Sequence, residues 1–159
     1  MHGTEASLGG VRHGMASVVK QAESQSPPAQ QACAVPFRRI KSRIEFCLVT
    51  SSSGRWLFPK GYIDAGTSPS ETALSEAYEE AGLHGRIVDE PLGCYEAPKN
   101  GDTRTVMAWL MEVSHCDDRW PESTLRQRRW VSPSEARELL CQPRLLEMLQ
   151  AALIRLRRR

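Results

Sequence analysis

Residues 61–83 read GYIDAGTSPSETALSEAYEEAGL, and this stretch carries the clearest structural signals in the chain. Ser68, Pro69 and Glu71 fit the N-cap, N1 and N3 positions of a helix, a capping box with proline where its missing N–H costs nothing. Gly82 stands where a residue in the left-handed conformation commonly ends a helix. The spacing therefore predicts a helix over residues 68–81.

Three carboxylates share one face of this helix. Glu76, Glu79 and Glu80 stand at i, i+3 and i+4. One interpretation is a solvated acidic face, which is what acidic runs usually are. The other is a cation site, because the apolar face lies opposite and a glycine loop, residues 59–61, precedes the helix. Carboxylates, a main-chain carbonyl and water form the hard oxygen environment that Mg²⁺ or Mn²⁺ prefers.

The rest of the chain predicts an α+β fold, a mixed β-sheet with helices packed against it. A second helix is expected to open at Ser132 and to be interrupted by Pro143, with a final helix from about Arg144. Apolar runs and alternating patterns predict strands at residues 32–37, 44–49, 55–59, 85–95, 103–113 and 129–131.

Length and composition fit one globular domain, since 40% of the 159 residues are hydrophobic and 25% are charged. A net charge of +2 is too small to imply a nucleic-acid partner by itself. Basic residues cluster within 38–43, 126–129 and 155–159. The last cluster is best explained by solubility, whereas the first two could face an anionic substrate.

Five cysteines without a CxxC pair favour neither a disulfide framework nor a zinc site. No stretch approaches the roughly 18 apolar residues of a membrane span, and no signal peptide is evident, so a cytoplasmic location is expected. Residues 1–30 are rich in Gly, Ser, Gln, Ala and Pro and predict a disordered leader. Residues 31–156 form the expected domain, and residues 157–159 a basic tail.

The stretch 61–83 resembles the motif of the Nudix hydrolases, G-x5-E-x7-R-E-U-x-E-E-x-G-U, in which U is a bulky aliphatic residue. Both glycines, the three helical glutamates and the final Leu83 fall in register. Thr67 replaces the first glutamate of the motif, Ser75 replaces its arginine, and Ala77 is small where the motif has a bulky residue. The arginine helps to hold the catalytic carboxylates in that family. Because the first glutamate and the arginine of the motif are both replaced here, we expect that this supporting pair was lost together, which leaves neither charge without its partner. The resemblance implies a Nudix fold, with the mixed sheet sandwiched between helices.

The resemblance also implies roles for the motif residues. Glu76, Glu80 and the Gly61 carbonyl would bind Mg²⁺ or Mn²⁺, and Glu79 would activate the attacking water or bind metal. A bound cation neutralises phosphate charge, orients the water and lowers its pKa. Because some members take the base from outside the motif, the alternative candidates are Glu96, Asp102 and Glu122.

Flanking sequences, from about Gln31 to Leu146, resemble the diphosphoinositol polyphosphate phosphohydrolases and the related diadenosine polyphosphate hydrolases. The supporting segments are residues 49–61, 103–105, 120–123 and 126–131. The implied partner is a small polyphosphorylated molecule, which needs several cationic groups. By position, the residues expected to bind it are Ser52, Ser53, Lys60, Arg104 and Arg128.

Several functions stay open at this point. The animal inositol enzymes carry a basic cluster before their first strand, whereas residues 28–31 are uncharged, so dinucleoside polyphosphates or another nucleoside-diphosphate-X compound are alternative substrates. The loss at Thr67 and Ser75 also permits a non-catalytic nucleotide or polyphosphate-binding module. An RNA pyrophosphohydrolase has only the arginine-rich C-terminus in its favour.

Overall fold

A computed structural model describes residues 28–159, and most of the expected leader lies outside these residues. Its centre is a mixed eight-stranded sheet built around β1 (Gln31–Ile40). Strand β7 (Asp102–Cys116) runs parallel to β1, and β2 (Arg43–Thr50) and β4 (Lys60–Tyr62) run antiparallel to it. Strand β4 is thereby held beside β1, with Gly61 opposite Ala32.

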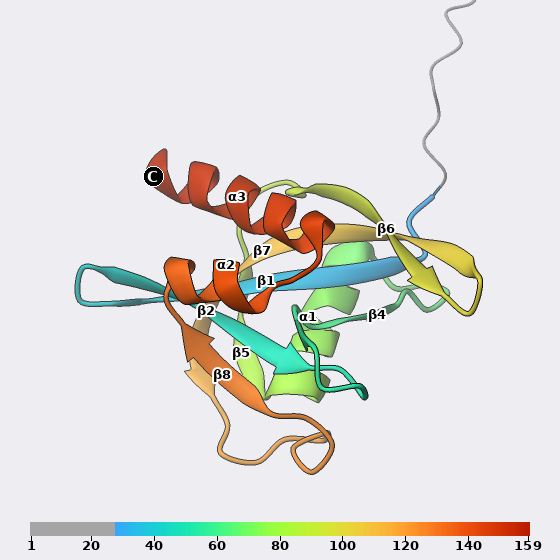
Figure 1. Ribbon diagram of the computed structural model, residues 1–159, viewed down its shortest axis with the longest axis horizontal. Coiled ribbons are helices and arrows are strands. Elements are labelled where there is room, and N and C mark those ends of the chain that lie inside the picture. The colour runs from blue at the N-terminus through green and yellow to red at the C-terminus, as the bar shows by residue number, and fades with distance from the viewer. Residues whose placement is uncertain (1–27) are drawn as a thin grey trace, which may run out of the picture.

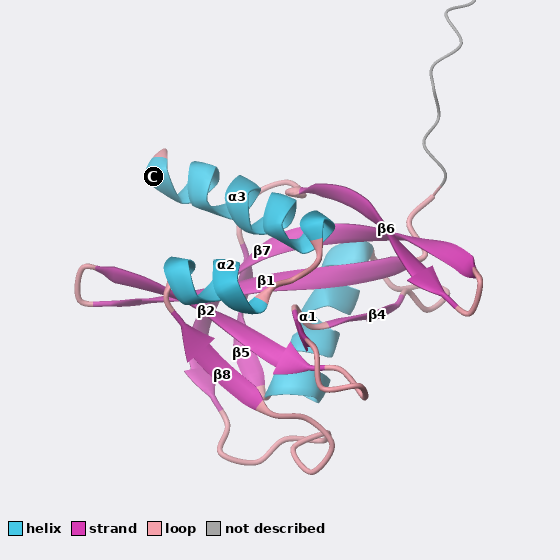
Figure 2. Cartoon of the chain, in the orientation of Figure 1, coloured by secondary structure: helices cyan, strands magenta, loops and turns pink. Residues whose placement is uncertain are grey.

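The remaining strands extend the sheet on both sides of this centre (Figures 1 and 2). Strands β3 (Trp56–Leu57) and β8 (Arg128–Val131) pair with β2. Strands β5 (Leu83–Ile87) and β6 (Gly93–Lys99) pair antiparallel with opposite ends of the long β7. The helices are α1 (Pro69–Ala81), α2 (Pro133–Leu139) and α3 (Pro143–Arg157).

Helices cover both faces of the sheet, α1 on one face and α2 and α3 on the other (Figure 1). Side chains alternate along β1, so Ala32 and Ala34 join the core under α1 while Cys33, Val35 and Phe37 join the core under α3. Helix α1 contributes Ala73, Ala77 and Ala81 to its core, all fully buried. Small residues on both partners bring the helix close to the strand, which explains why a small residue suits position 77.

The predicted α+β class, the helix over 68–81 and the two C-terminal helices separated by Pro143 are confirmed. Ser68 caps α1 through the full capping box, and Gly82 ends it with φ +66°. A single strand over 85–95 is wrong, because Asp89 adopts φ +60° and Pro91 follows, so the chain leaves β5 and re-enters as β6. The expected loop at Lys60 and Gly61 is the short strand β4.

None of the helices within residues 28–159 combines the length and the apolar character of a bilayer span. The cytoplasmic location and the division into leader, domain and basic tail stay predictions.

The end of α1 yields a stability prediction. Gly82→Ala forces a side chain into the left-handed region and places its Cβ 2.9 Å from Cβ of Trp120. We expect the free energy of unfolding to fall by about 2–4 kcal/mol. Gly66→Ala is the control, because Gly66 has φ +81° with nothing within 4 Å, and it should cost only about 1–2 kcal/mol. If urea denaturation gave equal losses of unfolding free energy for Gly82→Ala and Gly66→Ala, the close contact with Trp120 would make no contribution.

Candidate functional site

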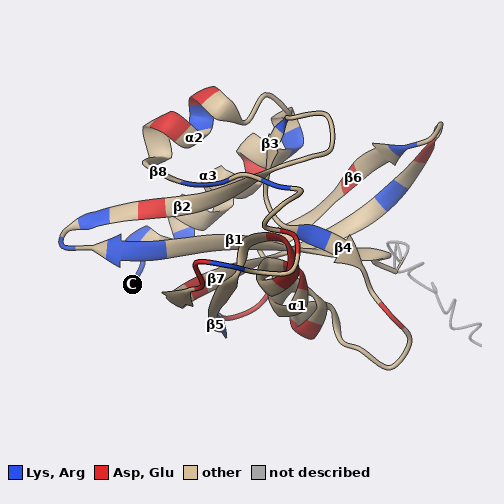
Figure 3. Ribbon diagram, turned by 90° about the horizontal axis from the view of Figure 1, so that it is seen from below, with Lys and Arg blue, Asp and Glu red and all other residues tan. Residues whose placement is uncertain are grey.

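Helix α1 carries three glutamates, and two of them, Glu76 and Glu80, reach strand β4. Glu80 is buried, with 6% of its surface exposed, Glu76 is half-buried and Glu79 is exposed. The Glu76 carboxylate lies directly on Gly61, where a Cβ would stand 2.2 Å from Cδ of Glu76. A side chain at position 61 would displace this carboxylate, so the site requires glycine there. Figure 3 shows the red acidic positions of α1 beside β4.

Burial and mutual repulsion disfavour ionisation of two of these carboxylates. Burial raises the pKa of Glu80 to about 8, an effect that Arg126 opposes and the neighbouring Glu76 and Glu122 reinforce. Burial also raises the pKa of Glu76, with further contributions from Glu79 and Glu122. These four glutamates, 76, 79, 80 and 122, form what we call the carboxylate cluster. Their charge is concentrated and only partly compensated by protein groups.

The loop between β7 and β8 is fastened to the last turn of α1. Helices leave their final carbonyls without intrahelical donors. Here four consecutive carbonyls, those of residues 79–82, receive donors from this loop and from the start of β8. The donors are Glu122 N–H to Glu79 O at 3.0 Å, Trp120 Nε1 to Glu80 O at 2.8 Å, Arg128 Nη1 to Ala81 O at 2.7 Å and Asp117 N–H to Gly82 O at 2.9 Å.

This loop brings Arg126 to the carboxylate cluster. Its Nη2 lies 3.4 Å from Oε1 of Glu80, its Nε donates to Oε2 of Glu122 at 3.2 Å, and its Nη1 donates to the Thr50 carbonyl at 2.8 Å. The Arg126 N–H donates to the Glu122 carbonyl at 3.0 Å, so the two side chains stand one helical turn apart on the same side.

Among the three alternative bases, Glu122 alone belongs to the carboxylate cluster. Glu96 is exposed on β6, opposite Thr105. Asp102 forms an ion pair with Arg104 at 2.9 Å.

Three of the five residues expected to bind substrate lie on the turn of residues 51–54 and on β4. Ser53 and Lys60 line a cavity of about 220 Å³ together with Ser51 and Arg55. Ser52 lies instead along a more open groove of about 470 Å³, which Arg126 also lines. Lys60 links this cavity to the carboxylate cluster, since it lines the cavity while its main chain lies beside Glu80 and opposes the rise in the pKa of that carboxyl.

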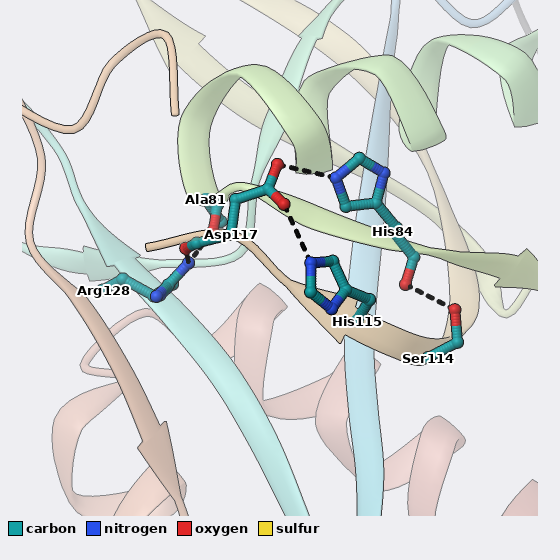
Figure 4. A network of polar contacts seen from close by, with 6 residues as sticks. All are labelled: Ala81, His84, Ser114, His115, Asp117 and Arg128. Carbon is teal, nitrogen blue, oxygen red and sulfur yellow. Dashed lines mark hydrogen bonds and ion pairs between the residues drawn. The ribbon is translucent and has the colours of Figure 1, made fainter. Parts of the chain in front are cut away.

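The two predicted arginines differ in what they contact. Arg104, near the β6–β7 hairpin, pairs with Asp102 and borders Tyr62. Arg128 is fully engaged, because it donates to the carbonyls of Ala81 and Asp117 (Figure 4). Its guanidinium carbon also lies 4.1 Å from the ring centroid of Trp120. Asp117 in turn lies between His84 and His115 (Figure 4). Arg128 therefore fixes the end of α1, and its predicted role in phosphate binding stays a prediction.

A family model described as NUDIX domain matches residues 28–152. The chain belongs to the Nudix family. Nudix hydrolase 4 of Arabidopsis thaliana is 39% identical over 119 residues, 68% of this chain and 56% of that protein. The bis(5'-nucleosyl)-tetraphosphatase [asymmetrical] of Rattus norvegicus is 37% identical over 140 residues, 79% of this chain and 91% of that enzyme.

Solved structures confirm the predicted Nudix fold. A Caenorhabditis elegans Ap4A hydrolase binary complex superposes with TM-score 0.71 at 24% identity, covering 83% of this chain and all of that one. The chain spans 56% and 62% of the length of the Arabidopsis Nudix hydrolases 4 and 21, so it matches only part of those proteins.

The donor set of this Nudix site suits a hard divalent cation. Four carboxylates gather beside one guanidinium, and two of them, Glu76 and Glu80, are held in partly desolvated positions beside the main chain of Gly61 and Lys60, respectively. Within residues 28–159, no three His, Cys, Asp or Glu side chains converge as a ready-made metal site. Mg²⁺ usually needs only one or two carboxylates, together with water and substrate phosphates.

The sequence indicated the glutamates, but it placed Arg126 only within a basic cluster that could face an anionic substrate, with no link to the glutamates. Its position four residues after Glu122 was the available signal, because that spacing favours an ion pair on one turn. The contact to Glu80 depends on how the loop folds onto α1, which no local pattern indicates.

Glu80 makes the metal-free protein pH-sensitive. Its pKa rises from 4.5 to about 8 on folding, so between these values the folded state holds a proton that the unfolded state releases. Stability therefore falls as pH rises through this window. Glu80→Gln should flatten the dependence and raise stability at pH 8 in EDTA, measured by urea denaturation. Glu138→Gln, at an exposed position of α2, is the control. An unchanged pH slope in Glu80→Gln would contradict the assignment.

Proposed function

We propose that the chain hydrolyses a phosphoanhydride bond of a polyphosphorylated small molecule and requires a divalent cation, Mg²⁺ or Mn²⁺. The observation that carries this proposal is the placement of Glu76 against Gly61 and of Glu80 beside the Lys60 main chain, near a polar groove. Nudix family membership and the named hydrolases among the relatives support it.

In this proposal Glu76 and Glu80 hold the cation with help from the Gly61 carbonyl. When bound, the cation neutralises phosphate charge and lowers the pKa of a bound water. Glu79 takes the proton of the attacking water, which suits its exposed position at the edge of the carboxylate cluster. Glu122 is the second candidate for this step, because it is the other cluster member that does not lie on Gly61 or in the core.

The substrate phosphates would lie over the turn of residues 51–54. Lys60 supplies a cation to the cavity lining, and among residues 28–159 its Nζ donates to Gln31 Oε1 at 3.1 Å, a bond that a phosphate can displace. Ser52 and Ser53 offer hydroxyl donors on either side of the turn. Arg104 would contact a more distant phosphate.

A dinucleoside polyphosphate is the substrate class that we favour. The rat asymmetrical tetraphosphatase is matched over 91% of its length, more completely than the Arabidopsis proteins. Residues 28–30, just before β1, carry no charge, unlike the basic cluster of the animal inositol enzymes. Asymmetrical cleavage of a dinucleoside tetraphosphate adds one water and yields a nucleoside mono- and triphosphate.

The test is a substrate panel of diadenosine tetraphosphate, a diphosphoinositol phosphate and ADP-ribose, each with Mg²⁺ and Mn²⁺. We expect AMP and ATP from the first substrate, and losses of kcat by about 100-fold or more in Glu79→Gln and Glu80→Gln. Glu147→Gln, exposed on α3, is the matched control. Activity unchanged by both site substitutions would overturn the assignment. Ligand-induced thermal stabilisation without turnover would instead identify a non-catalytic binding module.

A further inference from the structure

Residues 61–83 contain one aspartate, Asp64, and four glutamates, but no Lys, Arg or His. The positions of the motif that carry a supporting charge pair in the family hold Thr67 and Ser75, and Ser75 is exposed on α1. Helix α1 therefore supplies no cation to hold Glu76 and Glu80. A buried carboxylate without a partner is unfavourable, so the support must come from elsewhere in the fold.

Arg126 is the side chain that meets this need. It reaches Glu80 at 3.4 Å and Glu122 at 3.2 Å, and only 22% of its side chain is exposed. The Glu80 side chain is 8% exposed, so this pair is shielded from solvent far more than a surface ion pair.

The guanidinium is anchored independently of the carboxylates. Nη1 donates to the Thr50 carbonyl at 2.8 Å, at the end of β2. Thr50 and Gln127 are joined by two further hydrogen bonds, from Gln127 N–H to Thr50 Oγ1 at 2.9 Å and from Thr50 N–H to Gln127 O at 3.1 Å. Each side of the planar group thus faces a different partner, which a lysine ammonium cannot reproduce.

We infer that Arg126 is a positioning residue that replaces, from the β7–β8 loop, the charge pair missing at Thr67 and Ser75. It holds Glu80 and Glu122 in place and so shapes the carboxylate cluster. This inference rests on the proposed function for its catalytic consequence, but its structural part stands on the contacts alone. The rival role for Arg126 is direct phosphate binding, since it also lines the groove beside Ser52.

Introducing the glutamate and the arginine of the motif at positions 67 and 75 distinguishes the positioning role of Arg126 from phosphate binding. The variants are Arg126→Ala, Arg126→Lys, the pair Thr67→Glu with Ser75→Arg, and that pair combined with Arg126→Ala. Arg129→Ala is the matched control, because Arg129 pairs with Glu135 at an exposed position. Readouts are Tm of the metal-free protein in EDTA, and kcat and KM for diadenosine tetraphosphate.

We expect Arg126→Ala to lower kcat by about 10–100-fold with little change in KM. The kcat of Arg126→Lys should lie between those of wild type and Arg126→Ala. The transplanted pair should restore about 10-fold in kcat and raise Tm in the Arg126→Ala background, and do much less in wild type. The inference would be overturned if the effects of Arg126→Ala and of the introduced pair on Tm were purely additive. It would also be overturned if Arg126→Ala raised KM without lowering kcat. If wild type hydrolyses nothing, the proposed function fails, and the Tm cycle still decides about Arg126.

Discussion

Burial of the Glu80 carboxylate beside Glu76 is the constraint on which the site depends. Two like charges one turn apart on α1 weaken the helix, and burial adds a desolvation cost to each. The fold tolerates this because the neighbouring face of α1 packs tightly through alanines, while the capping box at Ser68 and the left-handed Gly82 fix both ends. Contacts outside the carboxylates therefore hold the helix in place.

The loop between β7 and β8 serves two purposes through one set of contacts. Its donors satisfy the four carbonyls at the end of α1, which fixes where the loop lies. The same placement brings Glu122 and Arg126 to the glutamates. Arg128 belongs to the first purpose, because its guanidinium binds main-chain carbonyls, whereas Arg126 belongs to the second. Two arginines two residues apart therefore differ in role because they contact different groups.

What the sequence predicted well was determined by nearby residues. Helix α1 was predictable because Ser68, Pro69, Glu71 and Gly82 determine its ends within a few positions. The strand expected over 85–95 failed because the break at Asp89 depends on β7 pairing with two separate strands, which is a long-range feature. Strand β4 was missed because its three residues form a strand only through β1. The three helical glutamates were predictable in the same local sense, whereas Arg126 was not, since nothing near it specifies a partner on α1.

An arginine in the loop does not support the site in the same way as one in the helix. A helical arginine moves with the glutamates that it holds, so its support is independent of the rest of the fold. Arg126 is fastened to the end of β2 through Thr50, just before the turn that carries Ser52 and Ser53. Arg126 therefore connects Glu80 and Glu122 to the end of β2, directly before that turn. Under the role inferred for Arg126, the departure from the motif at Thr67 and Ser75 makes the support of the carboxylate cluster depend on a residue that also lines the groove.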